Sequence, residues 1–247
     1  MIIIKSKREI DIMREAAKVT GEILRDVEGF IKPGITTHAI DNFVEERILH
    51  YKMKPTFKGY GGFPGAACVS VNDEVVHGIP SRDRVLKDIV SVDTGSTYKG
   101  YCSDAARTYA VGEISDEARR LIDVTKQSFF EGVKYAMVGY RLHDIGHAIQ
   151  EYAESNGFGV IREYLGHGIG RDLHEDPQVP NYGDAHTGPH LKEGMVLAIE
   201  PMITQGSYGT RVLGNDWTVV TDDGLLAAHY ENTVVITDGE PELLTLI

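Results

Sequence analysis

The sequence predicts an α+β fold with antiparallel hairpins, because it combines helical segments with strand-like segments that reverse turns connect. Residues 6–30 form the clearest helix. Ser6 and Glu9 match a capping box, and apolar residues recur behind them at helical spacing: Ile10, Met13, Ala17, Leu24 and Val27. The segment 29–34 contains Pro-Gly and breaks this helix. Three further helices are expected: Thr36 to about His50, one starting after Ser115 and one after Arg141.

Four segments have the residue pattern of strands. The segment "AACVSVNDEVVHGI" contains two short strands around the reverse-turn pair Asn72-Asp73. "IVSVDTG" alternates, with Val90 and Val92 on one face and Ser91 and Asp93 on the other. "GMVLAIEPMI" is an apolar run that Glu200 interrupts. "WTVVTDDGLLAAHYENTVVIT" is interpreted as a hairpin around residues 222–224.

The chain also repeats part of its own pattern at an offset of 105 residues. The matched pairs keep one register: Val19-Thr20 with Val124-Thr125, Gly34 with Gly139, His38 with His143, Ile40 with Ile145, and Glu46 with Glu151. One explanation is chance. The other is a duplicated helix–helix–strand unit folded as two pseudo-symmetric halves, about 1–110 and 111–247. Because no linker-like segment separates the halves, we expect one domain, 1–247.

Composition narrows the functional classes. The chain has 247 residues, 42% of them hydrophobic, and a net charge of −12. This negative charge argues against electrostatic binding of nucleic acid by the protein as a whole. Only two cysteines occur, Cys68 and Cys102, as is typical of a reducing compartment. No signal-peptide core and no 18-residue apolar run is found, so we expect a cytoplasmic protein without a membrane span.

Four carboxylates lie in or beside strand-like segments: Asp93, Asp104, Glu200 and Glu231. Taken singly, each is explained by a solvent-facing position, a salt bridge or a turn. Taken together, and with the histidines of "EYLGHGIGRDLHEDPQVPNY", they suggest a shared cation site. Four carboxylates supply enough charge for two divalent ions, with carboxylates bridging them. His167 and His174 are then expected to have different tasks, one on a metal and one on the substrate.

The ordered set Asp93, Asp104, His167, Glu200 and Glu231 resembles the five-ligand dimetal site of the methionine aminopeptidases. The stretches "VNDEVVHGIP", "GHGIGRDLHEDPQVPNY", "GMVLAIEPM" and "YENTVVIT" resemble that family as well. The resemblance covers essentially the whole chain and implies the pita-bread fold, two pseudo-symmetric α/β halves around a central antiparallel sheet. The span from His167 to Glu200 is short, and in this the chain resembles type I members of the family. No zinc-finger extension is found, and in this it resembles bacterial members.

The resemblance also implies residue roles. Asp104 and Glu231 would bridge the two metals, Asp93 would complete one metal site, and His167 and Glu200 the other. The implied nucleophile is a metal-bridging hydroxide whose proton goes to Glu200 or to a neighbouring carboxylate. The implied metals are Co, Mn, Fe or Zn.

Two further histidines would act on the substrate. His174 would donate to the scissile carbonyl, and His77 would contact the first peptide nitrogen of the substrate. The alternatives are a histidine that ties down a Gly/Pro loop and a turn histidine, respectively. Between His167 and His174, the glycines would let the backbone approach a crowded site.

The resemblance maps a methionine pocket onto Tyr60, Phe63, Cys68 and Trp217, with Phe57 and Leu173 at the rim. Ordinary loop packing is the alternative for the aromatic residues of "TFKGYGGFP". Asn72 resembles part of a monovalent-cation site. The sequence departs from the family in two places: the segment 86–93 is shorter by two residues, and Cys102-Ser103 precedes Asp104. Neither departure removes a ligand.

These features imply a dinuclear metallo-aminopeptidase that removes the N-terminal methionine of nascent proteins when the second residue is small. The expected substrates are N-terminal Met peptides and nascent chains, the expected neighbour is the ribosome, and the expected state is a monomer. Two alternatives remain open. One is an Xaa-Pro dipeptidase of the same fold, and the other is a metal-free binding protein that has lost the ligands.

Overall fold

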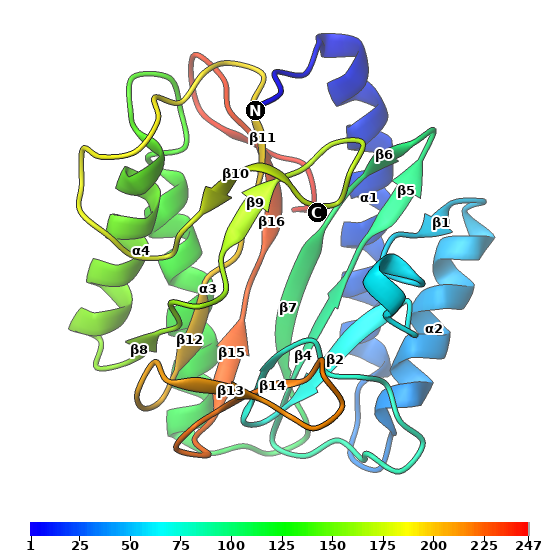
Figure 1. Ribbon diagram of the computed structural model, residues 1–247. Coiled ribbons are helices and arrows are strands. Elements are labelled where there is room, and N and C mark those ends of the chain that lie inside the picture. The colour runs from blue at the N-terminus through cyan, green and yellow to red at the C-terminus, as the bar shows by residue number, and fades with distance from the viewer. Residues whose placement is uncertain (247) are drawn as a thin grey trace.

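The computed structural model describes residues 1–246 as two helix pairs flanking a set of antiparallel strands (Figure 1). The α-helices are α1 (Lys7–Phe30), α2 (Thr37–His50), α3 (Asp116–Val133) and α4 (Leu142–Ser155), and a 3-10 turn, η1, spans Tyr60–Gly62. Helices α1 and α2 lie on one side of the strands, and α3 and α4 lie on the other (Figure 1). Mixed helices and antiparallel sheets confirm the predicted α+β class.

The strands are short and mostly buried. Those of the N-terminal part are β1 (Lys54–Pro55), β2 (Ala67–Val71), β3 (Glu74–Val76), β4 (Ile89–Thr94), β5 (Ser96–Tyr98), β6 (Tyr101–Cys102) and β7 (Ala105–Ala110). Those of the C-terminal part are β8 (Gly159–Val160), β9 (Gly166–Gly168), β10 (Glu175–Val179), β11 (Val196–Ile199), β12 (Met202–Thr204), β13 (Thr210–Val212), β14 (Val219–Thr221), β15 (Ala227–His229), β16 (Asn232–Val235) and β17 (Glu242–Leu243).

The helices start close to the predicted positions, and side-chain caps mark three of these starts. The Ser6 hydroxyl and the Glu9 carboxylate form the reciprocal capping box of α1. The Thr36 and Ser115 hydroxyls cap α2 and α3, each accepting from the backbone three residues on. All four predicted helices are therefore confirmed, because a cap and an apolar stripe specify a helix locally.

The 105-residue repeat has a structural counterpart. Helices α2 and α4 begin and end at positions that differ by this offset. Gly34 and Gly139, which precede them, both have positive φ angles, 90° and 104°. Each helix pair packs on its own core. The first core joins α1 and α2 to β2 and β4, and the second joins α3 and α4 to β11 and β16.

Antiparallel pairing organises the strands into five groups, in the orders β1-β5-β6, β2-β4-β7, β13-β14-β3, β15-β12-β8 and β10-β9-β11-β16-β17. The predicted hairpin around residues 222–224 is wrong. Strand β14 pairs with β13 and β3, whereas β15 pairs with β12. The turn at 222–224 is present, but β14 also pairs with the distant strand β3, and β15 pairs with β12, so the two strands do not pair with each other.

The two halves meet along β7, β15 and β16. The Thr108 hydroxyl donates to the carbonyl of His229 at 2.9 Å and accepts from its N–H at 2.8 Å. The N–H of Glu231 donates to the Ala106 carbonyl at 3.0 Å. This junction carries several of the predicted site residues. None of the described helices is long and apolar enough to cross a membrane.

Candidate metal centre and cavity

Three of the four predicted carboxylates lie where a strand is interrupted. Asp104 follows β6 and precedes β7, Glu200 separates β11 from β12, and Glu231 separates β15 from β16. Asp93 lies within β4, on the opposite face from Val90 and Val92 as the alternation predicts. At an interruption the side chain is released from the sheet alternation. The acids can therefore converge from separate strands.

Backbone contacts hold these interruptions in place. The Asp104 N–H donates to the Thr233 hydroxyl at 3.0 Å, and this hydroxyl donates back to the Asp104 carbonyl at 2.8 Å. The Asn181 amide donates to the Glu200 carbonyl at 3.0 Å. Because the backbone groups are satisfied by neighbours, the carboxylates remain free for other partners.

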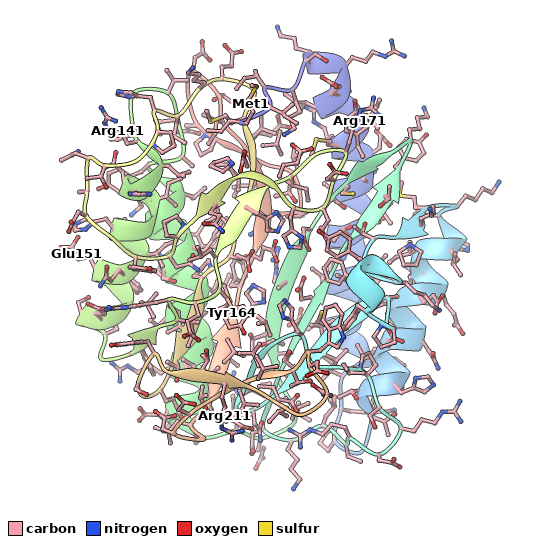
Figure 2. The ribbon with its side chains drawn as sticks, in the orientation of Figure 1. Met1, Arg141, Glu151, Tyr164, Arg171 and Arg211 are labelled. Atoms are coloured by element: carbon pink, nitrogen blue, oxygen red, sulfur yellow. The ribbon has the colours of Figure 1, made fainter. Side chains whose placement is uncertain are left out.

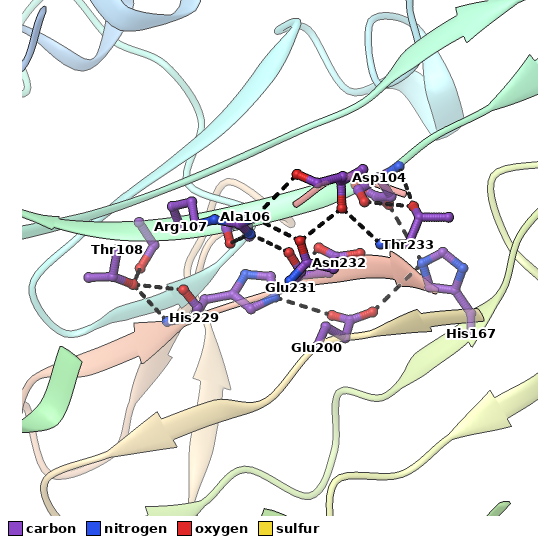
Figure 3. A network of polar contacts seen from close by, with 12 residues as sticks. Asp104, Ala106, Arg107, Thr108, His167, Glu200, His229, Glu231, Asn232 and Thr233 are labelled. Carbon is purple, nitrogen blue, oxygen red and sulfur yellow. Dashed lines mark hydrogen bonds and ion pairs between the residues drawn. The ribbon is translucent and has the colours of Figure 1, made fainter. Parts of the chain in front are cut away.

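His167 lies in β9, 6% exposed, and faces the same cluster. Its Nδ1 lies 2.8 Å from the Gly168 carbonyl, so it donates there and leaves Nε2 as an acceptor. That Nε2 lies 3.6 Å from Asp104 Oδ2 and 3.7 Å from Glu200 Oε1 (Figure 3). Burial opposes protonation of this imidazole, but Asp104 and Glu200 outweigh it and raise the pKa of His167.

The acids are buried without enough partners. Asp93 Oδ1, Asp104 Oδ1 and Glu231 Oε1 are covered and accept no hydrogen bond within residues 1–246. Burial, reinforced by the neighbouring acids, raises the pKa of both Asp93 and Glu231 well above the ordinary range. Such groups are costly to bury unless they are neutralised. Oxygen donors with one imidazole suit a divalent cation, so these residues fit metal ions.

Two triads of donor atoms meet the geometric requirement for an ion. Asp104, His167 and Glu231 form one triad, and Asp93, His229 and Glu231 form the other, each with its atoms within 4.8 Å of one another. Glu231 belongs to both triads. His229 was not predicted. It lies two residues before Glu231 in a strand-like segment, and this spacing, which places side chains on one face, was the available signal.

His174 lies beside His167, with ring centroids 4.3 Å apart. Its Nδ1 is 2.7 Å from the Tyr60 hydroxyl. Burial and the neighbouring His167 lower the pKa of His174. The two predicted histidines therefore lie together but have different partners, since only His167 is paired with the carboxylates within 4 Å.

The loop between these histidines is tied to the N-terminal segment. Lys5 and Glu175 form a buried ion pair at 2.5 Å, and the other Glu175 oxygen accepts from the Arg171 N–H at 2.9 Å. A Cβ at Gly170 would lie 2.4 Å from that oxygen, and one at Gly168 would lie 2.1 Å from the Asp176 carbonyl. Glycine is required at position 168 because the backbone of residue 176 approaches so closely. At position 170 a larger residue would displace the side chains of the Lys5–Glu175 pair.

A cavity of about 230 Å³ opens beside the acids. It is lined by every predicted ligand and substrate-contacting residue: Phe57, Tyr60, Phe63, Cys68, His77, Asp93, Asp104, His167, Leu173, His174, Glu200, Trp217 and Glu231. Four more lining residues were not predicted: Val76, Tyr164, Leu165 and Met202. They lie at strand ends and in loops, within or next to the stretches that resemble the methionine aminopeptidases, but they are apolar or aromatic residues that the sequence did not single out. In Figure 2, Tyr164 lies near the middle of this face, whereas Arg141, Glu151 and Arg211 lie at its edge.

Aromatic rings form one wall of the cavity. Phe63 and Trp217 contact edge to face with centroids 5.2 Å apart, and the His77 ring lies 5.8 Å from that of Tyr164. His77 has a left-handed backbone with a φ of 58°, and burial lowers the pKa of its imidazole. An apolar wall with an adjacent polar floor suits a ligand that has an apolar side chain and a polar backbone.

Asn72 does not line this cavity. Its side-chain amide donates to Asp88 at 2.9 Å, and its carbonyl oxygen accepts from the Ile89 N–H at 3.2 Å. Asn72 thus connects the turn after β2 to the start of β4. The shortened segment 86–93 still delivers Asp93 to the cavity.

This fold and this cluster define a metal-dependent enzyme of pita-bread architecture. The chain belongs to metallopeptidase family M24, whose pattern matches residues 11–238. It is therefore a hydrolase that binds divalent metal. It is 59% identical over 248 residues to the methionine aminopeptidase of Clostridium acetobutylicum, covering 100% of this chain and 99% of that protein.

Solved structures agree with this assignment. The methionine aminopeptidase of Thermotoga maritima superposes with a TM-score of 0.98 at 48% identity, covering 100% of both chains. The prolidase of Pyrococcus furiosus superposes with a TM-score of 0.80 at 24% identity, over 99% of this chain and 66% of that one. The second likeness concerns the fold alone.

Proposed function

We propose that this chain is a type I methionine aminopeptidase that removes the N-terminal methionine of peptides and nascent chains when the second residue is small. The observation that carries this proposal is an aromatic-walled cavity beside buried, unpartnered carboxylates. Full-length similarity to methionine aminopeptidases supports it. We also propose that the protein is a cytoplasmic monomer and that it meets its substrates near the ribosome.

Two divalent ions are proposed, drawn from Co, Mn, Fe and Zn. Asp104 and Glu231 would bridge them, Asp93 would complete one site, and His167 and Glu200 would complete the other. When bound, such ions supply a water of lowered pKa and polarise the scissile carbonyl. A monovalent cation near Asn72 stays a prediction. We further propose that residues 1–247 act as one domain with halves 1–110 and 111–247, since both halves supply donors.

The chain's own groups would carry out the remaining chemistry. Glu200 Oε would accept the proton of the attacking water and deliver it to the leaving amine. His174 Nε2 would donate to the carbonyl oxygen as negative charge develops. His77 would contact the first peptide nitrogen. Phe63, Trp217 and their neighbours in the cavity wall would enclose the methionine side chain and exclude water from it.

The direct test adds Mn(II) or Co(II) to metal-stripped protein and compares hydrolysis of Met-Ala-Ser with that of Ala-Pro. We expect methionine release from the tripeptide and little cleavage of the dipeptide. Preference for Ala-Pro would favour the Xaa-Pro dipeptidase alternative. If neither peptide is cleaved with any divalent ion, the alternative of a binding protein gains support and the aminopeptidase proposal fails.

Glu200→Gln tests the proposed chemistry. We expect turnover to fall by at least about 10³-fold, because the amide is not a base and binds metal weakly, while circular dichroism stays unchanged. Glu193→Gln is the matched control, since Glu193 is an exposed acid outside the cavity and its loss should leave kcat unaltered. Retained activity in Glu200→Gln would contradict the mechanism.

A further inference from the structure

His229 is a sixth donor side chain in the metal-binding cluster, beyond the five ligands proposed above. It ends β15 and is 2% exposed. Its Nε2 lies 3.6 Å from Glu200 Oε2 and 3.8 Å from Glu231 Oε2. This nitrogen forms no hydrogen bond within the described chain. A buried imidazole nitrogen without a partner is costly. Its position therefore needs a physical explanation.

The arrangement of His229 repeats that of His167. Glu200 lies between the two imidazoles and directs Oε1 toward His167 and Oε2 toward His229, at 3.7 and 3.6 Å (Figure 3). Each imidazole also faces one further carboxylate, Asp104 for His167 and Glu231 for His229. The cluster thus has one nitrogen donor at each end.

These separations are too long for hydrogen bonds, which end near 3.2 Å for nitrogen and oxygen. They are close to the spacing of two ligands on one ion, since atoms about 2.1 Å from a tetrahedral metal lie roughly 3.4 Å apart. His229 also belongs to the donor triad of Asp93 and Glu231. The Thr108 hydroxyl fixes its backbone through both the N–H and the carbonyl.

We propose that His229 Nε2 is a metal ligand, so that each ion of the proposed dimetal site has its own imidazole. His167 serves the ion near Asp104, and His229 serves the ion near Asp93. This inference rests on the proposed function, because it assumes that two ions are bound. Nitrogen at both positions favours borderline ions such as Zn, Co and Fe over ions that prefer oxygen alone.

The test is X-ray absorption spectroscopy of the full-length protein loaded with two equivalents of Zn(II). We expect an average of one imidazole per zinc in the wild type and half that number in His229→Gln. Calorimetric titration of the same variant should show the weaker of the two dissociation constants raised at least about tenfold. His190→Gln, which removes an exposed histidine outside the cavity, should leave both measurements unchanged.

Each contrary result has a distinct meaning. A wild type that binds two zinc ions with only one imidazole between them overturns the assignment of His229, and this measurement does not depend on a variant folding. Weakened binding in His229→Gln with an unchanged imidazole count also overturns it, and makes His229 a positioning residue for Glu200. A wild type that binds no divalent ion overturns the proposed function itself.

Discussion

At the scale of single residues, the two histidines of the "GHGIGRDLH" stretch differ in their hydrogen-bond partners and therefore in their expected roles. His167 donates from Nδ1 to its neighbour's carbonyl and directs Nε2 at the acids. His174 has its Nδ1 beside the Tyr60 hydroxyl. If that hydroxyl donates, Nε2 of His174 carries the proton. The ring can then act as a donor toward a carbonyl oxygen.

Replacing His174 by Ala tests this division directly. We expect kcat to fall about 10²- to 10³-fold, as when one donor to a developing oxyanion is removed, while metal stoichiometry stays at the wild-type value. Steady-state kinetics with metal analysis of the same sample is the measurement. Loss of metal from the variant would show that His174 is a ligand and that its proposed role is wrong.

Tyr60→Phe keeps the aromatic ring and removes only the hydroxyl that orients His174. We expect kcat to fall about tenfold, within the range found for partners that orient an active-site histidine, and KM for Met-Ala-Ser to change little. A large rise in KM with unchanged kcat would instead show that Tyr60 acts mainly as part of the wall of the methionine pocket.

At the scale of elements, caps and strand interruptions determine where the chemistry lies. Helix α1 starts at a capping box, and the Glu9 carboxylate also accepts from the Tyr101 hydroxyl at 2.7 Å, which connects the helix to β6. The Ser6 backbone N–H, with Tyr101, lowers the pKa of Glu9 from 4.5 to about 2. A lowered pKa means that the ionised form stabilises the folded state.

Glu9→Gln should therefore be destabilising in a pH-dependent way. The stabilisation by ionised Glu9 is complete above pH 4.5 and is lost as the pH falls toward 2, so the variant should differ most near neutral pH. Because Glu9 is partly exposed, we expect only about 1 kcal/mol. Urea unfolding at pH 7 and pH 3.5 measures the difference. An equal deficit at both values would contradict this assignment.

At the scale of the whole molecule, the donors come from both halves and meet at their junction. Asp93 and Asp104 precede residue 111, whereas His167, Glu200 and Glu231 follow it. Bound ions would thus connect two separately packed cores. Without them, repulsion among buried acids weakens the junction.

Chelation should accordingly lower the thermal midpoint. A ligand present at about 100 times its dissociation constant stabilises the folded state by about 2.7 kcal/mol, which corresponds to roughly 5–10 °C for a chain of this size. Differential scanning calorimetry before and after EDTA treatment, with Mn(II) added back as the control for reversibility, measures the shift. An unchanged midpoint would mean that the ions do not connect the halves.

Sequence alone determined the elements whose signals are local. The capping box at Ser6 located the start of α1, local patterns placed the other helix starts near Thr36, Ser115 and Arg141, and the repeat pattern anticipated the shared offset of α2 and α4. The four acids and His167 were chosen because their order along the chain resembles the ligand set of the methionine aminopeptidases, and all five line one cavity. Local hydrogen bonds and periodicity suffice for such features, since they do not depend on distant residues.

Tertiary structure alone decided which strands pair and which side chains converge. Strands β14 and β15 are joined by a short turn yet belong to different sheets, because burial of their apolar faces against β3 and β12 overrides the local hairpin signal. The same folding brings His229 Nε2 to 3.6 Å from Glu200 Oε2, although the two residues lie 29 positions apart in the chain. Convergence of distant donors on one point depends on the register of many strands, and that register is settled only when the two halves pack.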